Sequence, residues 1–285
     1  MSEKRQAPPT VRLRRLAAML RRLRTAADLT REEVTERTGI NGVTLYRIEK
    51  ARARPQKRTL TALMEVYGAS EAERSDLLAA ERHSQDRSWL RPYHAGLSER
   101  YAAYIGFEAE ARTVRAYEPS FVPGLLQTER YARAVIRGAL HGAGPSEPGA
   151  RVAALMERQA ALGASPPLRL RAVLDEAAVR RVVGGRDVMR EQAEHLLRIA
   201  EEPEICVQVI PFGAGAHTGM AGGFVHLDFP DPRDPELVYM DTPAGDLFLE
   251  SEAETRQFRA AFERLRAVAL APRSSADLLA EVCRS

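Results

Sequence analysis

The side chains best suited to reading DNA lie together in residues 41–47. An asparagine amide can pair bidentately with adenine and an arginine guanidinium with guanine, while valine or the threonine methyl can contact a thymine methyl. This stretch supplies each of these groups, and the candidates for base contacts are Asn41, Val43, Thr44, Tyr46 and Arg47. Two of them have alternatives: Arg47 could form a salt bridge within the protein, and Tyr46 could contact a phosphate or pack at the edge.

Basic side chains around this stretch could bind the DNA backbone. Contacts to phosphates fix the orientation of a protein on the duplex without reading its sequence. The candidates are Arg31, Arg52, Arg54 and Lys57. Arg52 and Arg54 could equally be solvated loop charges. Only three of the 42 basic residues are lysines, so no single arginine is evidence by itself.

The distribution of charge supports an N-terminal part that binds a polyanion. Residues 1–70 carry 16 lysines and arginines against 7 aspartates and glutamates, a net charge of +9. Residues 71–285 carry 26 against 32, a net charge of −6. Such asymmetry is typical of a nucleic-acid-binding module joined to a part with another role. A solvated basic surface is the alternative.

Four helices must position these side chains. Residues 11–27 repeat leucine at helical spacing, and Thr30 with Glu33 forms a capping box for a short second helix that ends near Gly39. Asn41 is a good N-cap for a third helix, and a fourth follows it. The inward-facing residues of the last two helices are Leu45, Ile48, Leu60, Leu63, Met64 and Tyr67.

The order of these helices predicts a helix-turn-helix domain over residues 1–70, with its third helix in the major groove. The segment from Leu29 to Pro55 resembles the motif of the Cro/CI-repressor-like (XRE) family. The resemblance is carried by Glu33-Val34-Thr35, by Gly39 and by Thr44-Leu45-Tyr46-Arg47-Ile48-Glu49. It implies a DNA-binding regulator.

Four positions depart from the typical pattern of that family. Arg31 stands where a phosphate-binding glutamine is frequent, and Thr35 stands where a small alanine lets the two helices approach. Gly42 replaces a side chain that commonly reads a base, and Ala51 replaces the C-capping glycine. We therefore expect slightly altered packing between the two helices and one base contact fewer.

The rest of the chain reads as a helical connector, residues 71–90, followed by an α+β domain, residues 91–285. After Pro167 the period changes from helical to alternating. Strands are predicted at residues 168–174, 205–210, 223–229, 236–241 and 246–250, and a turn suited to a hairpin at residues 242–245. The expected fold class is α+β, an all-α helix-turn-helix bundle followed by an α+β domain with a mainly antiparallel sheet.

This larger part also resembles a known family. The similarity lies in residues 104–111, 118–119 and 122–132, with shorter matches at 176–177, 211–213, 223–224 and 238–239. These segments look like the large C-terminal domain of WhiJ-type, antitoxin-like actinobacterial regulators. The resemblance implies control of development or antibiotic production and a small partner protein encoded nearby. It supplies no catalytic residues.

Few side chains in this part could form a catalytic or metal site. His226 and Asp228 alternate on one face of a strand, and with His217 they could gather in one pocket for metal binding or acid–base chemistry. A solvated sheet face is the alternative. Glu108 and Arg112 have the spacing of an ion pair on a helix surface.

Other signals of catalysis are weak. The glycine-rich segment 212–223 leads into a strand and lacks a Gly-Lys-Ser/Thr ending, so we expect a loop and not a phosphate cradle. Cys206 and Cys283 are the only cysteines, which argues against a disulfide framework and a thiolate zinc site. We expect no enzyme activity, no metal and no cofactor. An unrecognised activity of the C-terminal domain is the alternative.

One aromatic face could belong to a ligand or partner site. Tyr101, Tyr104 and Phe107 share a helical face, which could line a pocket or contact a partner, with helix core as the alternative.

These patterns together predict a transcriptional regulator that binds a double-stranded DNA operator. We expect a homodimer, because a lone helix-turn-helix covers too few base pairs for specificity. The second domain would bind a small partner protein or a small-molecule ligand. An antitoxin-like protein that neutralises its partner and autoregulates its operon is the alternative. No apolar stretch approaches the roughly 18–20 residues that span a bilayer, and we expect a cytoplasmic protein with no membrane association.

Overall fold

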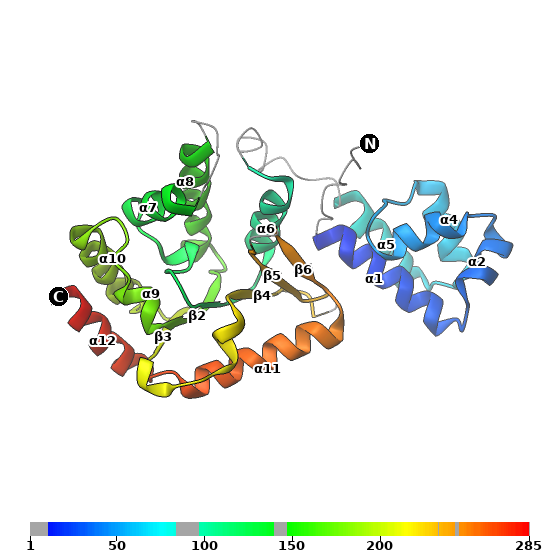
Figure 1. The fold of residues 1–285 in the computed structure, drawn as a ribbon. Coiled ribbons are helices and arrows are strands. Elements are labelled where there is room, and N and C mark those ends of the chain that lie inside the picture. The colour runs from blue at the N-terminus through cyan, green and yellow to red at the C-terminus, as the bar shows by residue number, and fades with distance from the viewer. Residues whose placement is uncertain (1–10, 84–96, 140–146, 233, 243–244, 285) are drawn as a thin grey trace.

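The computed structural model of this chain describes residues 11–83, 97–139, 147–232, 234–242 and 245–284. An N-terminal bundle of helices lies beside a larger domain in which helices cover both faces of a sheet (Figure 1). The predicted fold class, a helical bundle followed by an α+β domain, is confirmed. The bundle and the domain each have a hydrophobic core of their own.

The N-terminal bundle consists of five helices. They are α1 (Val11–Ala26), α2 (Arg31–Thr38), α3 (Gly42–Glu49), α4 (Lys57–Val66) and α5 (Glu71–His83). Leu20 of α1, Leu45 of α3 and Leu63 of α4 are completely buried in the shared core. Leu77 of α5 is buried there too, so this part of the expected connector packs against α1. Residues 84–90 of the connector lie outside the described residues.

Local signals set the ends of α2 and α3. The Thr30 hydroxyl accepts a hydrogen bond from the Glu33 amide, and the Glu33 carboxylate accepts one from the Thr30 amide, which completes the predicted capping box. Gly39 ends α2 with φ 68°, in the left-handed region that glycine tolerates best. The Asn41 side chain then accepts a hydrogen bond from the Val43 amide and starts α3. Ala51, which follows α3, holds φ 52° without glycine.

The C-terminal domain is built on one six-stranded sheet. Its strands are β1 (Thr113–Glu118), β2 (Arg169–Asp175), β3 (Ile205–Ile210), β4 (Phe224–Asp228), β5 (Leu237–Met240) and β6 (Leu247–Leu249). Their spatial order is β3-β2-β1-β4-β5-β6. The pairings β1–β4, β4–β5 and β5–β6 are antiparallel, whereas β1–β2 and β2–β3 are parallel, so the sheet is mixed. Residues 243–244 of the predicted hairpin turn lie outside the described residues.

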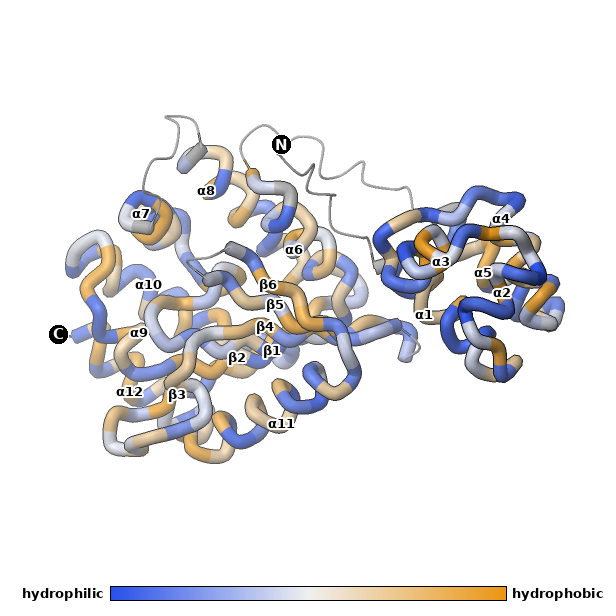
Figure 2. The backbone as a smooth tube through the Cα atoms, turned by 45° about the vertical axis from the view of Figure 1, so that its right-hand side comes forward, coloured by the Kyte–Doolittle hydropathy of each residue, from blue (hydrophilic) through white to orange (hydrophobic). Residues whose placement is uncertain are grey.

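The two faces of the sheet carry different layers of helices. Helices α6 (Glu99–Glu110), α7 (Glu129–Ala139), α8 (Glu147–Arg158) and α10 (Arg186–Ile199) lie over one face, and α11 (Glu252–Val268) crosses the other (Figure 1). The short α9 (Glu176–Arg180) follows β2, and α12 (Pro272–Arg284) packs against α10 and β3. Hydrophobic positions run along β4, β5 and β6 between these layers (Figure 2).

Alternation along β1 shows how one strand serves both faces. Val114 and Ala116 belong to the large core under α6, α7 and α10, while Tyr117 belongs to the smaller core with Phe262 of α11. Successive side chains of a strand point to opposite faces, so Glu118 lies on the same face as Ala116. This alternation decides which face of the sheet each polar side chain of β1 lies on.

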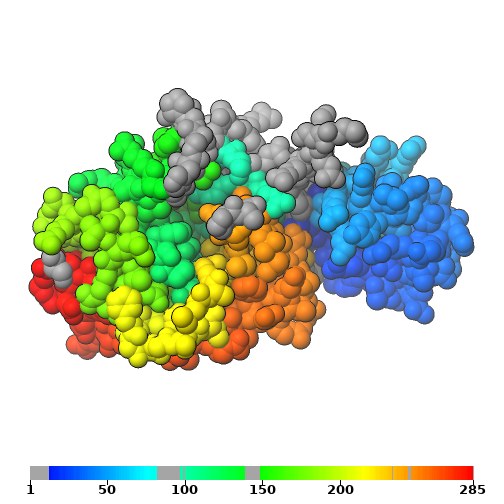
Figure 3. Space-filling model, viewed as in Figure 1, coloured from blue at the N-terminus to red at the C-terminus, as the bar shows by residue number. Residues whose placement is uncertain are grey.

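Helix α1 joins the bundle to the C-terminal domain. The Arg14 side chain is almost completely buried, donates to the Glu236 carbonyl at 2.9 Å and pairs with Glu250 at 3.2 Å. Its guanidinium also lies 5.2 Å from the centre of the Phe107 ring. Arg15 adds an ion pair to Asp231 at 2.7 Å. The bundle therefore abuts the edge of the domain formed by β5 and β6 (Figure 3).

Candidate functional site

The start and outer face of α3 form an exposed surface. Leu45 and Ile48 point into the bundle, and the residues between them face outward. The exposed set comprises all five candidates for base contacts, Asn41, Val43, Thr44, Tyr46 and Arg47. Val43 is 62% exposed and Tyr46 is 38% exposed, which is unusual for large apolar side chains. Arg47 forms no ion pair with any described residue, which favours base reading over the salt bridge considered above.

The four candidates for phosphate contacts differ in their surroundings. Arg52 and Lys57 are exposed. The Arg31 guanidinium lies 5.3 Å from the centre of the Tyr46 ring, and that of Arg52 lies 6.0 Å from it, so two cations flank this ring. Arg54 is half-buried and pairs with Glu81 of α5, so its guanidinium is engaged within the bundle.

A buried carboxylate, Glu49, fixes α3 against its neighbours. Glu49 is 2% exposed and accepts hydrogen bonds from Arg24 of α1 at 2.6 Å and from Arg31 of α2 at 2.8 Å. The hydrogen bond to Glu49 raises the pKa of Arg24. A buried charge is tolerable only when it is paired, and here two guanidinium groups pair with one carboxylate. In the sequence, Glu49 stood out only as the last residue of the motif that resembles the XRE family, although its place beside the inward-facing Ile48 was a signal of this role.

Two departures from the family pattern lie next to each other between α2 and α3. A Cβ atom on Gly42 would lie 3.6 Å from Oγ1 of Thr35, which is ordinary van der Waals contact. The threonine thus occupies space beside a position that has no side chain. Together with Arg31 and Val43, these residues line a shallow hollow at the edge of the recognition surface.

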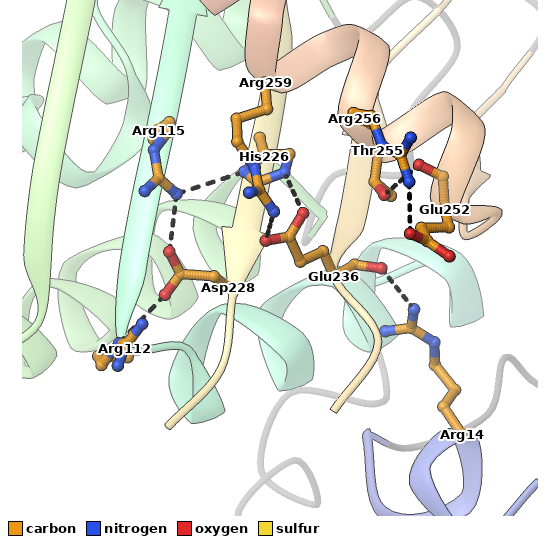
Figure 4. A network of polar contacts seen from close by, with 10 residues as sticks. All are labelled: Arg14, Arg112, Arg115, His226, Asp228, Glu236, Glu252, Thr255, Arg256 and Arg259. Atoms are coloured by element: carbon orange, nitrogen blue, oxygen red, sulfur yellow. Dashed lines mark hydrogen bonds and ion pairs between the residues drawn. The ribbon is translucent and has the colours of Figure 1, made fainter. Parts of the chain in front are cut away.

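The C-terminal candidates His226 and Asp228 lie on the sheet face that α11 crosses, within a network of ion pairs (Figure 4). His226 is completely buried, and its Nε2 lies 3.1 Å from Oε2 of Glu236. Arg115 lies 2.8 Å from Asp228 and 3.4 Å from Nδ1 of His226. This face is packed with paired charges and is not a solvated surface.

Glu236 links this network to α11. Burial alone would raise the pKa of Glu236, but hydrogen bonds from His226 and from Arg259 of α11 lower it to about 2. The carboxylate is therefore ionised and paired throughout the neutral range. The backbone carbonyl of Glu236 accepts a hydrogen bond from the Arg14 guanidinium, so this network also adjoins α1 (Figure 4).

His217 lies apart from His226 and Asp228. It lies 3.4 Å from Asp175, at the opposite end of the strands, and packs edge-on against Tyr117 with ring centres 6.0 Å apart. The three candidates therefore share no pocket. Within the described ranges, no group of three or more His, Cys, Asp or Glu side chains could hold a metal ion.

The predicted ion pair between Glu108 and Arg112 is wrong. Helix α6 ends at Glu110, so Arg112 does not lie one helical turn above Glu108. Arg112 instead pairs with Asp228 at 3.4 Å. Glu108 is 2% exposed and pairs with Arg158 of α8 through both carboxylate oxygens, each at 2.7 Å.

The aromatic face of α6 is mostly core. Tyr104 and Phe107 are buried, and Tyr104 stacks on Tyr239 of β5 with ring centres 3.9 Å apart. Phe107 packs on Phe248 with ring centres 5.7 Å apart, beneath Arg14. Tyr101 and Tyr104, but not Phe107, line a cavity under α6.

The glycine-rich segment forms two short 3-10 turns, Phe212–Ala214 and Thr218–Ala221, before β4 begins. Neither turn starts a helix that could cradle a phosphate, as expected. Its glycines serve packing instead: a Cβ atom on Gly219 would lie 2.3 Å from the Tyr117 ring, and one on Gly223 would lie 2.8 Å from Oε2 of Glu118.

The bundle and its exposed α3 define a protein with a helix-turn-helix DNA-binding domain. A helix-turn-helix family model matches residues 15–77. The model of a domain of unknown function, DUF5753, matches residues 101–281, more than half of the chain, and the chain belongs to the DUF5753 family. No curated protein and no solved structure matches. Among the described residues, no helix is both long and apolar enough to cross a bilayer.

Proposed function

We propose that this chain is a sequence-specific transcriptional regulator of the XRE type, which inserts α3 into the major groove of an operator. The observation that supports this most directly is the exposure of every candidate base-contact residue along α3, above a buried face that holds the helix in place. Arg31, Arg52 and Lys57 surround this face with positive charge suited to phosphates. The regulator acts in the cytoplasm.

Arg54 is the weakest of the four phosphate candidates. Its Nη2 donates to both the carbonyl and the carboxylate of Glu81, and these contacts would have to break before it could reach DNA, whereas the contact of Arg31 with Glu49 is made through Nε. We therefore assign its charge to the packing of α5 on the loop after α3.

The C-terminal domain regulates this head in our proposal. Its contact with α1 includes the buried Arg14, and buried, paired arginines define a fixed docking geometry. A homodimer would place two heads at half-sites about one helical turn of DNA apart. The resemblance to WhiJ-type regulators supports a small partner protein encoded nearby, in the control of development or antibiotic production. Co-purification with the product of the neighbouring gene tests that partner.

Arg47→Ala is expected to weaken binding to the operator by about 1–3 kcal/mol and to relax its base preference at one position. The reason is that an exposed arginine without an internal ion pair can pair bidentately with a guanine. The operator is first selected by the full chain from random duplexes, and variants are then compared by gel-shift titration. Arg137→Ala, an exposed arginine of α7, is the matched control. An unchanged base preference in Arg47→Ala would exclude base reading by this residue.

Arg31→Ala is expected to weaken binding to all duplexes alike and to reduce the salt slope of log K by about one unit. One phosphate contact is lost, whereas Glu49 keeps its hydrogen bond from Arg24, so the helix remains anchored. Titrations of operator and random DNA at two or more salt concentrations measure the slope. A loss confined to the operator would contradict a phosphate role.

A further inference from the structure

Residues of the sheet and of helices α6 and α8 of the DUF5753 domain line a cavity of about 200 Å³. Its floor is apolar and comes from three adjacent strands, with Ala116 of β1, Leu170 of β2 and Val225 of β4. This volume exceeds the roughly 150 Å³ of a cavity that holds benzene. An apolar cavity with a few polar groups is the usual form of a small-molecule site.

One arginine of the lining is fully engaged by its neighbours. Arg158 donates to both oxygens of Glu108 and to the hydroxyl of Tyr101 at 2.8 Å. The Tyr104 hydroxyl adds a hydrogen bond to Glu108 at 2.6 Å. The charges of Arg158 and Glu108 therefore compensate each other, and this group forms a rigid polar wall.

Arg151 and Asp241 bring opposite charges to another part of the lining. Burial and the neighbouring Asp246 raise the pKa of Asp241, while Arg151 acts in the opposite direction. The Arg151 guanidinium also lies 5.4 Å from the centre of the Tyr101 ring. Arg151 and Asp241 carry opposite charges when both are ionised, and Asp246 adds a negative charge beside them.

Glu118 is the carboxylate of the cavity whose charge is not compensated. No described residue forms a hydrogen bond or ion pair with it, and its Oε2 lies against the backbone of Gly223. Burial, followed by the negative charge of Asp241, raises its pKa to about 8. Tyr117 and Tyr131 are the other titratable groups that interact with it. The carboxyl of Glu118 is therefore mostly protonated at neutral pH, and a cation bound beside it would favour its ionised form.

Two further features of the lining suit a ligand with an ammonium group. Gln127 is 3% exposed, and its Oε1 accepts no hydrogen bond from the described residues, although its Nε2 donates to the Val122 carbonyl at 2.6 Å. The rings of Tyr101 and Tyr104 line the same space, but the Arg158 guanidinium already lies 5.7 Å and 5.1 Å from their centres, so these rings offer apolar contact to the body of the ligand.

We propose that this cavity binds a small organic ammonium compound with an aromatic or branched aliphatic body. Glu118 is the counter-ion of the ammonium group, and the floor formed by β1, β2 and β4 holds the apolar body. Binding itself does not depend on DNA. Its use as a regulatory signal rests on the proposed function. A series of ring contacts joins the cavity to α1: Tyr104 stacks on Tyr239, Tyr239 contacts Phe248, and Phe248 contacts Phe107, which lies beneath Arg14.

Three probes of similar size distinguish the proposed chemistry: 2-phenylethylammonium, the neutral 2-phenylethanol and the anion 3-phenylpropanoate. Isothermal titration of the full chain at pH 7 is expected to give the tightest binding for the ammonium compound, by about 10-fold or more. If the anion binds best, or if none of the three binds more tightly than about 10 mM, the proposal is wrong.

Substitution of Glu118 distinguishes the contribution of its charge to probe affinity from that of the shape of the cavity. Glu118→Gln is expected to reduce the affinity for 2-phenylethylammonium to that for 2-phenylethanol, whereas Glu202→Gln, an exposed control on the same domain, leaves it unchanged. Glu118 holds its proton up to about pH 8, so glutamine resembles its neutral form and preserves folding, which thermal denaturation verifies. Ala116→Leu fills the cavity floor and is expected to remove binding of all probes. Retained ammonium preference in Glu118→Gln would overturn the proposal.

The pH dependence provides an independent readout. Glu118 must lose its proton to pair with an ammonium group, so the affinity is expected to rise about 10-fold per unit from pH 6 to pH 7 and to level off above about pH 8. Glu118→Gln removes this rise. DNA binding in the absence of probe is expected to be the same in both proteins. If only the cavity proposal is wrong, the protein still binds DNA but shows no preference for the ammonium probe. If the proposed function is wrong, DNA binding itself is missing.

Discussion

Val43→Glu is expected to reduce the affinity for DNA by about 100-fold or more and to leave the fold unchanged. The Val43 side chain is 62% exposed on the first turn of α3, so the bundle loses no packing when it is replaced. In the proposed complex this position faces the floor of the major groove. A carboxylate placed there meets the negative potential of the duplex, and like charges brought together at an interface cost several kcal/mol.

Val182→Glu is the matched control for this prediction. Val182 is 65% exposed, lies in the C-terminal domain and receives the same change of charge. Fluorescence anisotropy with the selected operator compares the two variants, and circular dichroism verifies their folding. We expect unaltered binding in Val182→Glu. Equal losses in both variants would show that net charge alone is responsible, and wild-type affinity in Val43→Glu would exclude α3 as the recognition helix.

The N-terminal bundle could be predicted closely because its determinants are local. The capping box of Thr30 and Glu33 and the left-handed Gly39 are encoded within a few residues, and the structure has both. Asn41 caps α3 in the same way. Contacts that close within one or two turns of helix leave a pattern in the sequence itself.

The sheet could be predicted only in part, because strand order depends on distant partners. Strand β1 was missed: it begins three residues after α6 ends, and it pairs with β2 and β4, which lie far along the chain. This strand changes the topology, because its pairing with β2 is parallel, as is the pairing of β2 with β3. The expected antiparallel pairing is found among β1, β4, β5 and β6.

The polar side chains of the domain show the same limit. Alternation correctly placed His226 and Asp228 on one face, but their partners Arg115 and Glu236 come from neighbouring strands. Glu118 gives no signal as a site residue in the sequence, where it lies in a segment that resembles a known family. Its surroundings depend on which helices pack over the sheet. The residues next to Glu118 in the chain do not reveal which helices those are.

The same packing makes Gly219 the most sensitive position of the glycine-rich segment. An added Cβ atom would lie 2.3 Å from Cε1 and Cζ of Tyr117 and 2.6 Å from its hydroxyl oxygen. The Tyr117 ring is completely buried against Phe224 and cannot move aside without disturbing the smaller core. Because the backbone of Gly219 has no left-handed φ, steric overlap alone decides the cost of a substitution.

Gly219→Ala is therefore expected to destabilise the C-terminal domain by about 3 kcal/mol and to lower its melting temperature by roughly 6–12 °C. Gly213→Ala is the control: it lies in the same segment, it has no left-handed φ, and a Cβ atom there meets nothing within 4 Å. Thermal denaturation followed by circular dichroism compares both variants with the wild type. Equal melting temperatures for the two would contradict the close contact with Tyr117. Since Tyr117 directly precedes Glu118, the loss should also extend to ammonium binding in Gly219→Ala, whereas Gly213→Ala retains it.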